Sequence, residues 1–267
     1  MIIEFISGIG SPSSQAEGAE LPNFITLLYH KFKDSEFIGF LHHWENIIFS
    51  WMIILFICIL AYLASRKSSL IPSGLQNFME IIVEGLHNFF VGILGPQGRK
   101  YVPFLGTLFI YILMMNLLGL VPFMKSPSAS INITAALAII VFVRVQYLNM
   151  RNYGLFKFLY HLAGSPKNIT SWAMVPLIFP SHLITEFARP LTLALRLFGN
   201  ITGEDILIAA FAILGISILS AVNSPVGLPL QVPFIFLALL TSFIQALVFA
   251  LLSTVYILLA FPPKEEH

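Results

Sequence analysis

Charged residues are scarce in this sequence. Only 10% of its 267 residues are Asp, Glu, Lys or Arg, whereas a soluble domain usually carries about 25%. Hydrophobic residues make up 57% of the chain, and the mean hydropathy is +0.87. This is more apolar surface than one soluble core could bury. The sequence therefore predicts an all-α protein that crosses a membrane several times.

Features of several other protein classes are also missing. The single cysteine, Cys58, lies in an apolar run, which excludes a disulfide and a CxxC metal or redox site. His42 and His43 have no second histidine cluster that could complete a metal site, so we expect no metal and no cofactor. The net charge of +1 gives no sign of a nucleic-acid partner. The N-terminus lacks a basic residue before its apolar part and is a poor signal peptide.

Long apolar runs divide the chain. Residues 1–45 are mixed in character and predict a tail with one short interfacial helix, followed by a single membrane domain over 46–267. About twenty apolar residues cross a hydrocarbon layer of ~30 Å. Five membrane-embedded segments are predicted, at 47–65, 102–122, 131–147, 174–222 and 230–261. Residues 73–94 show helical apolar spacing with charged residues elsewhere on the wheel, which is typical of an interfacial amphipathic helix.

Basic residues are unevenly distributed between the predicted loops. If the N-terminus is outside, nine face the inner side: Arg66, Lys67, Arg99, Lys100, Arg144, Arg151, Lys157, Lys167 and Lys264. The outer side then receives only Lys31, Lys33 and Lys125. Since basic residues concentrate on the cytoplasmic side, the bias predicts an outer N-terminus and a cytoplasmic C-terminus.

A polar stretch from His182 to Asp205 lies between apolar regions. Five of its residues fall close to one helix face: His182, Glu186, Arg189, Arg196 and Asn200. Ionisable groups at membrane depth are costly, so they indicate function. Arginine is always protonated in proteins, and Arg196 therefore needs an anion or water nearby. Arg189 is expected to pair with Glu186 or to extend to the interface, and His182 to belong to the anchoring end of the helix.

Two acids follow this arginine. Glu204 and Asp205 lie about 80° and about 180° round the helix from Arg196, so at least one faces away from it. A proton could then reach a carboxylate without passing the arginine. On the last segment, Gln245 is a buried amide that needs partners, which Arg196 or Asn200 could supply; a role as simple inter-helix contact is equally compatible with the spacing.

Two other functional classes are compatible with a polytopic chain. A secondary transporter or antiporter would carry an internal repeat and broken helices in both halves, but no repeat is found and only one half carries the charges. An intramembrane enzyme would carry a Gly-x-Ser-Gly, Gly-x-Gly-Asp or multiple-histidine pattern, and none is present.

The run Pro190-Leu-Thr-Leu-Ala-Leu-Arg196-Leu-Phe-Gly-Asn200 resembles the a subunits of F-type ATP synthases, and its Arg-Leu-Phe-Gly-Asn core is a specific signature. The resemblance extends over most of the chain, through 103–109, Asn116 in the second span and 244–256, and is strongest to bacterial and chloroplast forms. The position three residues after Asn116, polar in the family, is Gly119 here, and Ala238 stands where many bacterial members have histidine.

The resemblance implies a proton-translocating stator subunit that is not itself catalytic. Two half-channels and Arg196 would couple ion flow to rotation of a c-subunit ring, with the last two segments tilted as a hairpin against that ring. Asp205 matches the family's half-channel carboxylate, Glu204 precedes it, and Asn200 and Gln245 match the polar partners of the arginine. The implied partners are the c-ring, b-type peripheral stalk subunits, the rest of the F1Fo complex and lipid. The implied location is a bacterial inner membrane, or a thylakoid membrane, with H⁺ or Na⁺ as the ion.

Overall fold

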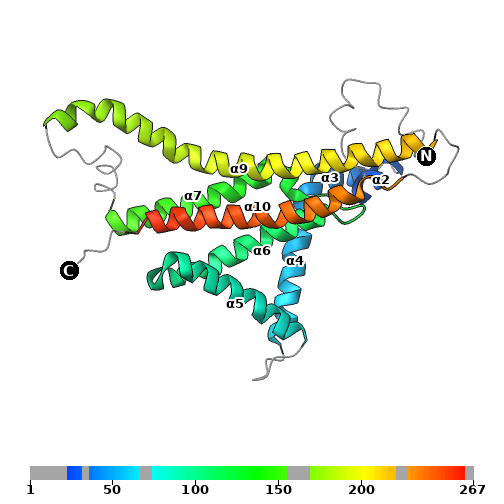
Figure 1. Cartoon of the computed structure of the whole chain (residues 1–267), viewed down its shortest axis with the longest axis horizontal. Helices are drawn as coiled ribbons and strands as arrows, with labels where there is room; N and C mark the ends of the chain where they lie inside the picture. Colours follow the sequence, from blue (N-terminus) through cyan, green and yellow to red (C-terminus); the bar gives the residue numbers. More distant parts are fainter. Residues whose placement is uncertain (1–22, 32–35, 67–73, 155–168, 221–227, 262–267) are drawn as a thin grey trace. The chain divides into compact units, whose positions relative to one another are not determined.

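A computed structural model describes residues 23–31, 36–66, 74–154, 169–220 and 228–261 (Figure 1). These residues are almost entirely helical. The helices in chain order are α2 (Phe24–Lys31), α3 (Glu36–His43), α4 (Glu45–Ser65), α5 (Leu75–Leu94), α6 (Val102–Leu118), α7 (Ile131–Tyr153), α9 (Ile169–Ser220) and α10 (Val232–Leu259). Short 3-10 turns, η1 (Pro96–Tyr101) and η2 (Pro127–Ala129), lie before α6 and α7.

The helix lengths confirm an all-α polytopic membrane protein. Within the described ranges, 6 helices are long and apolar enough to cross a bilayer. Five of them are the segments that the sequence predicts. The sixth is α5, predicted as an interfacial amphipathic helix, which also meets the criterion of length and composition.

Some helix boundaries differ from the predicted ones. The sequence predicts that the third segment ends at residue 147, but α7 continues to Tyr153. The helix ends where Gly154 adopts a positive φ of 73° and donates its N–H to the carbonyl of Met150, a conformation that glycine adopts without strain. The second segment ends earlier than residue 122, at Leu118, because the chain turns at Gly119.

The predicted segment 174–222 is the 52-residue helix α9, which starts earlier, at Ile169; residues 221 and 222 lie outside the described ranges. Three prolines lie inside this helix: Pro176, Pro180 and Pro190. Proline removes a backbone donor, and membrane helices tolerate it partly because nearby hydroxyls bond to carbonyl groups. In α9 the hydroxyls of Ser181, Thr185 and Thr192 each donate to a carbonyl three or four residues earlier, but these carbonyls are not the ones, at positions 172, 176 and 186, that the prolines leave without a donor.

The N-terminal tail contains two short helices, α2 and α3, where the sequence predicts one. Residues 1–22 and 32–35 of that tail lie outside the described ranges. Asn23, the residue before α2, caps the helix: its Oδ1 accepts hydrogen bonds from the N–H of Thr26 at 2.8 Å and from the Thr26 hydroxyl at 3.0 Å. This is the arrangement of an N-terminal helix cap.

Backbone contacts divide the chain into two compact units. The first contains Met1–Phe56, Ile112–Ser130 and Phe198–Gln245, and the second contains Ile57–Tyr111, Ile131–Leu197 and Ala246–His267. Each unit has its own buried apolar side chains. In the first these include Phe49, Ile53, Ile112, Met115 and Ile201, and in the second Phe90, Leu105, Val141, Phe249 and Ile257.

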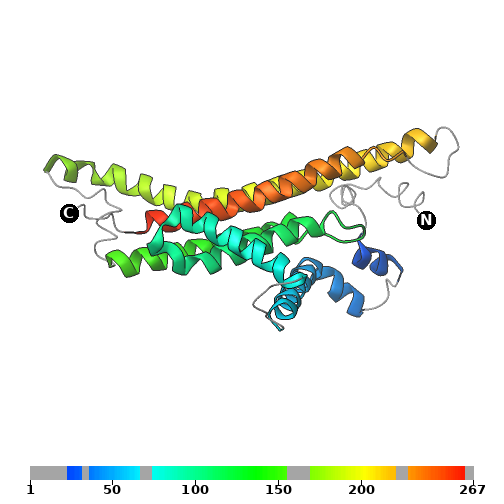
Figure 2. The ribbon, with the colours of Figure 1, turned by 60° about the horizontal axis from the view of Figure 1, so that its bottom comes forward.

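Within each unit, the parts of α9 and α10 that belong to it lie side by side and antiparallel (Figures 1 and 2). In the first unit, Phe211 stacks on Phe234 with ring centroids 4.0 Å apart, and Asn200 bonds to Gln245. In the second unit, the Arg189 guanidinium lies over the Tyr256 ring. These pairs recur every eleven residues on each helix. Eleven residues are close to three helical turns, so the same face of each helix returns to the contact.

Candidate functional site

A hydrogen bond between Asn200 and Gln245 joins α9 to α10. Asn200 Nδ2 donates to Gln245 Oε1 at 2.6 Å, which confirms Asn200 as a partner for this amide. Gln245 is only 4% exposed. Its Nε2 has no hydrogen-bond partner among the described residues, and a buried N–H group of this kind is normally satisfied by protein or ordered water.

Asn116, on α6, connects to the same part of α10. Its Nδ2 donates to the backbone carbonyl of Ser242 at 3.2 Å, and its Oδ1 accepts from the Ser128 hydroxyl at 2.6 Å. Asn116 is 2% exposed, so its burial agrees with the sequence. Ser128 could not be identified from the sequence: the polar composition of residues 125–130 predicts a turn, but nothing in it indicates that a serine folds back onto α6.

The acidic pair lies on the part of α9 that belongs to the first unit. Glu204 and Asp205 are both half-buried. Glu204 Oε1 is buried and has no hydrogen-bond partner within the described part of the chain, and the same holds for Thr202 Oγ1 and Ser242 Oγ. Together with Gln245 Nε2, these atoms are four buried polar atoms on two paired helices that the described protein atoms leave unsatisfied. Such atoms indicate water.

In the second unit, Arg189 is paired as its spacing predicts. Its Nη1 lies 2.9 Å from Glu186 Oε1, and its guanidinium carbon lies 5.4 Å from the centroid of the Tyr256 ring. Glu186 Oε2 also accepts a hydrogen bond from Gln146 Nε2 at 3.1 Å. Three elements, α7, α9 and α10, thus hold this ion pair. The positive charge of Arg189 is therefore compensated by a carboxylate of the same chain.

Arg196 differs from Arg189 in its exposure and, within the described residues, in its lack of a carboxylate partner. Its side chain is exposed, and no carboxylate lies within 4 Å of it among the residues that the structure describes. Gly199 and Gly203, three and seven residues further along α9, are also exposed, and a Cβ added to either would meet nothing within 4 Å. Arg196 therefore lies on a face of α9 with small residues and open space.

The structure brings some of the predicted site residues together and not others. Asn200 and Gln245 are bonded, Asn116 bonds to α10 three residues before Gln245, and Glu186 is bonded to Arg189. His182 is exposed, at the N-terminal side of this group on α9. No group of three or more His, Cys, Asp or Glu side chains that could hold a metal occurs in the ranges described.

Comparison with known proteins covers most of the chain. Residues 47–258 match the family model described as ATP synthase A chain. A protein of Protochlamydia amoebophila named ATP synthase subunit a is 58% identical over 92% of this chain and 91% of its own length. Proteins with the same name from Solidesulfovibrio magneticus and Trichlorobacter lovleyi are 41% and 38% identical, over 80% and 79% of this chain and 82% and 84% of theirs.

Proposed function

Because the chain belongs to the ATP synthase A chain family and has that family's role as a stator subunit of the membrane sector, we propose that Arg196 is the fixed charge that faces the rotor ring. The supporting observation is the contrast between two arginines on α9. Arg189 is compensated by Glu186, whereas Arg196 is exposed and has no carboxylate within 4 Å in the described ranges. An uncompensated arginine at membrane depth costs about 2.5 to 3.5 kcal/mol. A carboxylate on another chain would remove that cost.

The mechanism follows from the different cost of burying a charged and a neutral carboxyl group. A proton that enters on one side neutralises a rotor carboxylate, which can then turn through lipid because its charge is gone. When the carboxyl meets Arg196, an attraction of about 4 kcal/mol at ~4 Å and an effective dielectric of about 20 favours the ionised form. The proton leaves on the other side. The fixed charge of Arg196 also repels protons, which prevents leakage between the two half-channels.

The entry path is assigned to the acidic part of α9. Glu204 or Asp205 would pass the proton, and the unsatisfied polar atoms of Thr202, Ser242 and Gln245 would hold the water that carries it. Asn200 and Gln245, bonded at 2.6 Å, would orient Arg196 or that water. The driving force is about 2.3 kcal/mol per charge per 100 mV.

The proposal extends to the ion, the partners and the location of the subunit. The subunit is non-catalytic, carries no cofactor and conducts H⁺, with Na⁺ as the alternative ion. Its partners are a ring of c subunits, b-type stalk subunits, the rest of the F1Fo complex and membrane lipid. It lies in a bacterial inner membrane with its N-terminus outside, a thylakoid membrane being the alternative location, and α9 and α10 form the tilted hairpin against the ring.

Co-purification tests the proposal against the rival function of a secondary transporter. The chain would be extracted in mild detergent and isolated through an affinity tag at one terminus. We expect a ring of small two-helix proteolipids to remain bound. Recovery of the chain free of such a ring, with uptake of a solute into vesicles that contain this chain alone, would contradict the proposal.

A further inference from the structure

We propose that the connection between α6 and α7 is a positioning device for the polar pair on α9 and α10. The Glu45–Lys125 ion pair fixes the position of this connection. Ser128, next to Ser126, then bonds to the side chain of Asn116. Asn116 in turn bonds to α10 close to Gln245. All of these residues belong to the first unit. The contacts stand by themselves, and their effect on ion flow rests on the function proposed above.

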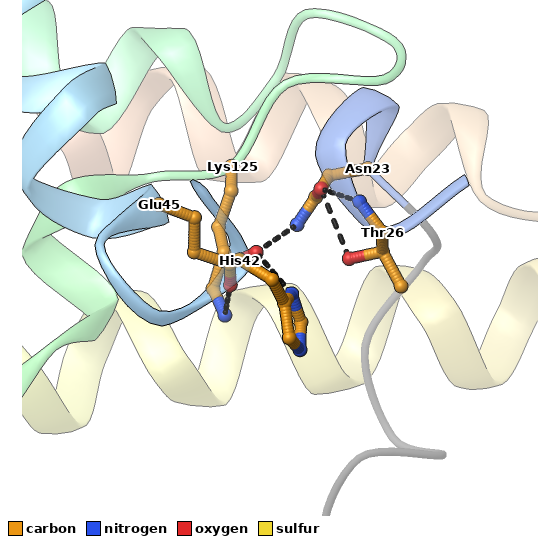
Figure 3. Close-up of polar contacts among 5 residues, drawn as sticks. All are labelled: Asn23, Thr26, His42, Glu45 and Lys125. Atoms are coloured by element: carbon orange, nitrogen blue, oxygen red, sulfur yellow. Dashed lines mark hydrogen bonds and ion pairs between the residues drawn. The ribbon is translucent and has the colours of Figure 1, made fainter. Parts of the chain in front are cut away.

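The outer end of the device is a cluster around Glu45, the first residue of α4 (Figure 3). Glu45 is only 7% exposed. Oε1 lies 2.9 Å from Lys125 Nζ, and Oε2 lies 3.2 Å from His42 Nδ1 and accepts a hydrogen bond from Asn23 Nδ2 at 3.4 Å. Figure 3 shows these three side chains converging on Glu45 from three different segments.

A second contact joins the N-terminal helices to the same connection. The N–H of Phe24, the first residue of α2, donates to the carbonyl of Phe123 at 2.9 Å. Phe123 has a positive φ of 66°, which costs free energy in a non-glycine residue and persists only where the surroundings impose it. Contacts at Phe123 and Lys125 thus fix the chain just before the two serines.

The serines fold back onto α6. Ser126 Oγ donates to the carbonyl of Met115 at 3.0 Å and lies 2.7 Å from Ser128 Oγ, and Ser128 Oγ donates to Asn116 Oδ1 at 2.6 Å. Ser126 is 1% exposed and Ser128 is fully buried. Both hydroxyls are therefore fixed by protein groups, and Ser128 determines which way the Asn116 amide points.

Gly119 permits this arrangement. A Cβ at position 119 would lie 2.8 Å from Ser126 Cβ, closer than two carbon atoms can approach. This is the position at which the family resemblance leads us to expect a polar side chain. In this chain Ser126 takes up that space, so hydroxyl groups from the connection supply polar atoms there.

The inner end of the device is α10. Asn116 Nδ2 donates to the Ser242 carbonyl at 3.2 Å. Residues three apart lie on the same side of a helix, so this bond holds the turn of α10 that carries Gln245, which accepts from Asn200 at 2.6 Å. Buried polar networks are cooperative, and the loss of one member leaves others buried and unsatisfied. A change at Lys125 or Ser128 should therefore reach the Asn200–Gln245 pair.

The test uses the intact ATP synthase complex, reconstituted in liposomes, with proton-driven ATP synthesis measured per assembled complex. We expect Glu45→Gln, Lys125→Met and Ser128→Ala each to lower the rate about fivefold to tenfold. The matched control is Ser253→Ala, because Ser253 is also fully buried but, among the residues that the structure describes, bonds only to its own helix, at the Phe249 carbonyl. Lys125→Arg should keep the rate, because it preserves the positive charge opposite Glu45 Oε1 and leaves the contacts of Glu45 with His42 and Asn23 unchanged.

A double-mutant cycle separates positioning from a general loss of stability. If Ser128 acts through the Gln245 pair, Ser128→Ala should cost little further rate in a Gln245→Ala background. Independent, multiplicative effects of the two changes would overturn the proposal, as would normal rates in Glu45→Gln and Ser128→Ala. Those outcomes leave the proposed function intact as long as Arg196→Ala is inactive. Full activity of Arg196→Ala would instead refute the function.

Discussion

Asn200 donates a hydrogen bond of 2.6 Å to Gln245 across the contact between α9 and α10. Asn200 is four residues after Arg196, one turn along the same continuous helix. The bond therefore fixes α10 against the turn of α9 that follows the arginine. The position of Gln245 on α10 therefore depends on Asn200 on α9, and a change in either residue affects the other.

Replacement of Asn200 alone should destabilise the subunit. Asn200→Leu leaves Gln245 Oε1 buried without its donor, at a cost of about 1 to 3 kcal/mol. The double variant Asn200→Leu/Gln245→Leu removes both polar groups and should recover part of that loss. Thermal release of the subunit from the purified complex measures both effects. Equal release temperatures for the single variant and the unmodified subunit would contradict the importance of the bond.

The two acids on α9 should differ in effect. With a single proton carrier, one of Glu204→Gln and Asp205→Asn should reduce proton uptake at least about tenfold, while the other has a small effect. Proton uptake by vesicles that contain the membrane sector measures this directly. Equal and mild losses in both variants would exclude a single carrier.

Gly203 should matter for assembly with the rotor and not for folding. It is exposed, and a Cβ added there would meet nothing within 4 Å in the described chain. We expect Gly203→Leu to insert and accumulate normally but to lose proton-driven synthesis, because the added side chain would obstruct a closely packed neighbouring helix.

Gly215 on the same helix provides the control for that prediction. A Cβ at this position would overlap the backbone carbonyl of Leu228, so Gly215→Leu should reduce the amount of subunit in the membrane. Quantitative immunoblots of membranes distinguish the two variants. Normal ATP synthesis by Gly203→Leu would show that no rotor helix approaches this face closely.

The Glu186–Arg189 pair should contribute to stability. Its side chains are 18% and 31% exposed, so Glu186→Ala should cost about 1 to 2 kcal/mol, less than the ~3 to 5 kcal/mol for one partner of a fully buried pair. Glu80→Ala is the control, since Glu80 bonds to Gln76 on the exposed surface of α5. Detergent unfolding curves of the two variants give the comparison, and equal midpoints would show that the ion pair adds nothing.

Local patterns predicted most of the helices and one of the contacts. Glu186 and Arg189 are three residues apart on one helix, so their pairing follows from helix geometry. The predicted third segment ends at residue 147, six residues before the end of α7, because basic residues such as Arg144 and Arg151 indicate the membrane interface and not the end of a helix. Long basic side chains can extend from a continuing helix to the interface, and the helix ends only at Gly154.

Apart from Asn200–Gln245, which the spacing predicts as one of two alternatives, contacts between distant segments could not be predicted. Glu45 and Lys125 are 80 residues apart, and Asn116 and Ser242 are 126 residues apart. The periodic spacing of apolar residues predicts helices and their buried faces, but it does not predict these two polar contacts. Both contacts depend on how the connection between α6 and α7 folds back onto the helices. Gly119 was noted only as a missing polar side chain, and the structure gives a physical reason for it, since Ser126 occupies the adjacent space.

Proton-driven ATP synthesis by an Arg196→Ala variant tests the central claim most directly. The complex would be reconstituted in liposomes under an imposed proton gradient, and ATP hydrolysis by its detached catalytic heads measured in parallel. Arg189→Lys is the matched control on the same helix, since it keeps the charge beside Glu186. We expect no synthesis by Arg196→Ala, normal hydrolysis by its catalytic heads, and substantial synthesis by Arg189→Lys. Near-normal synthesis by Arg196→Ala would contradict the role assigned to this arginine.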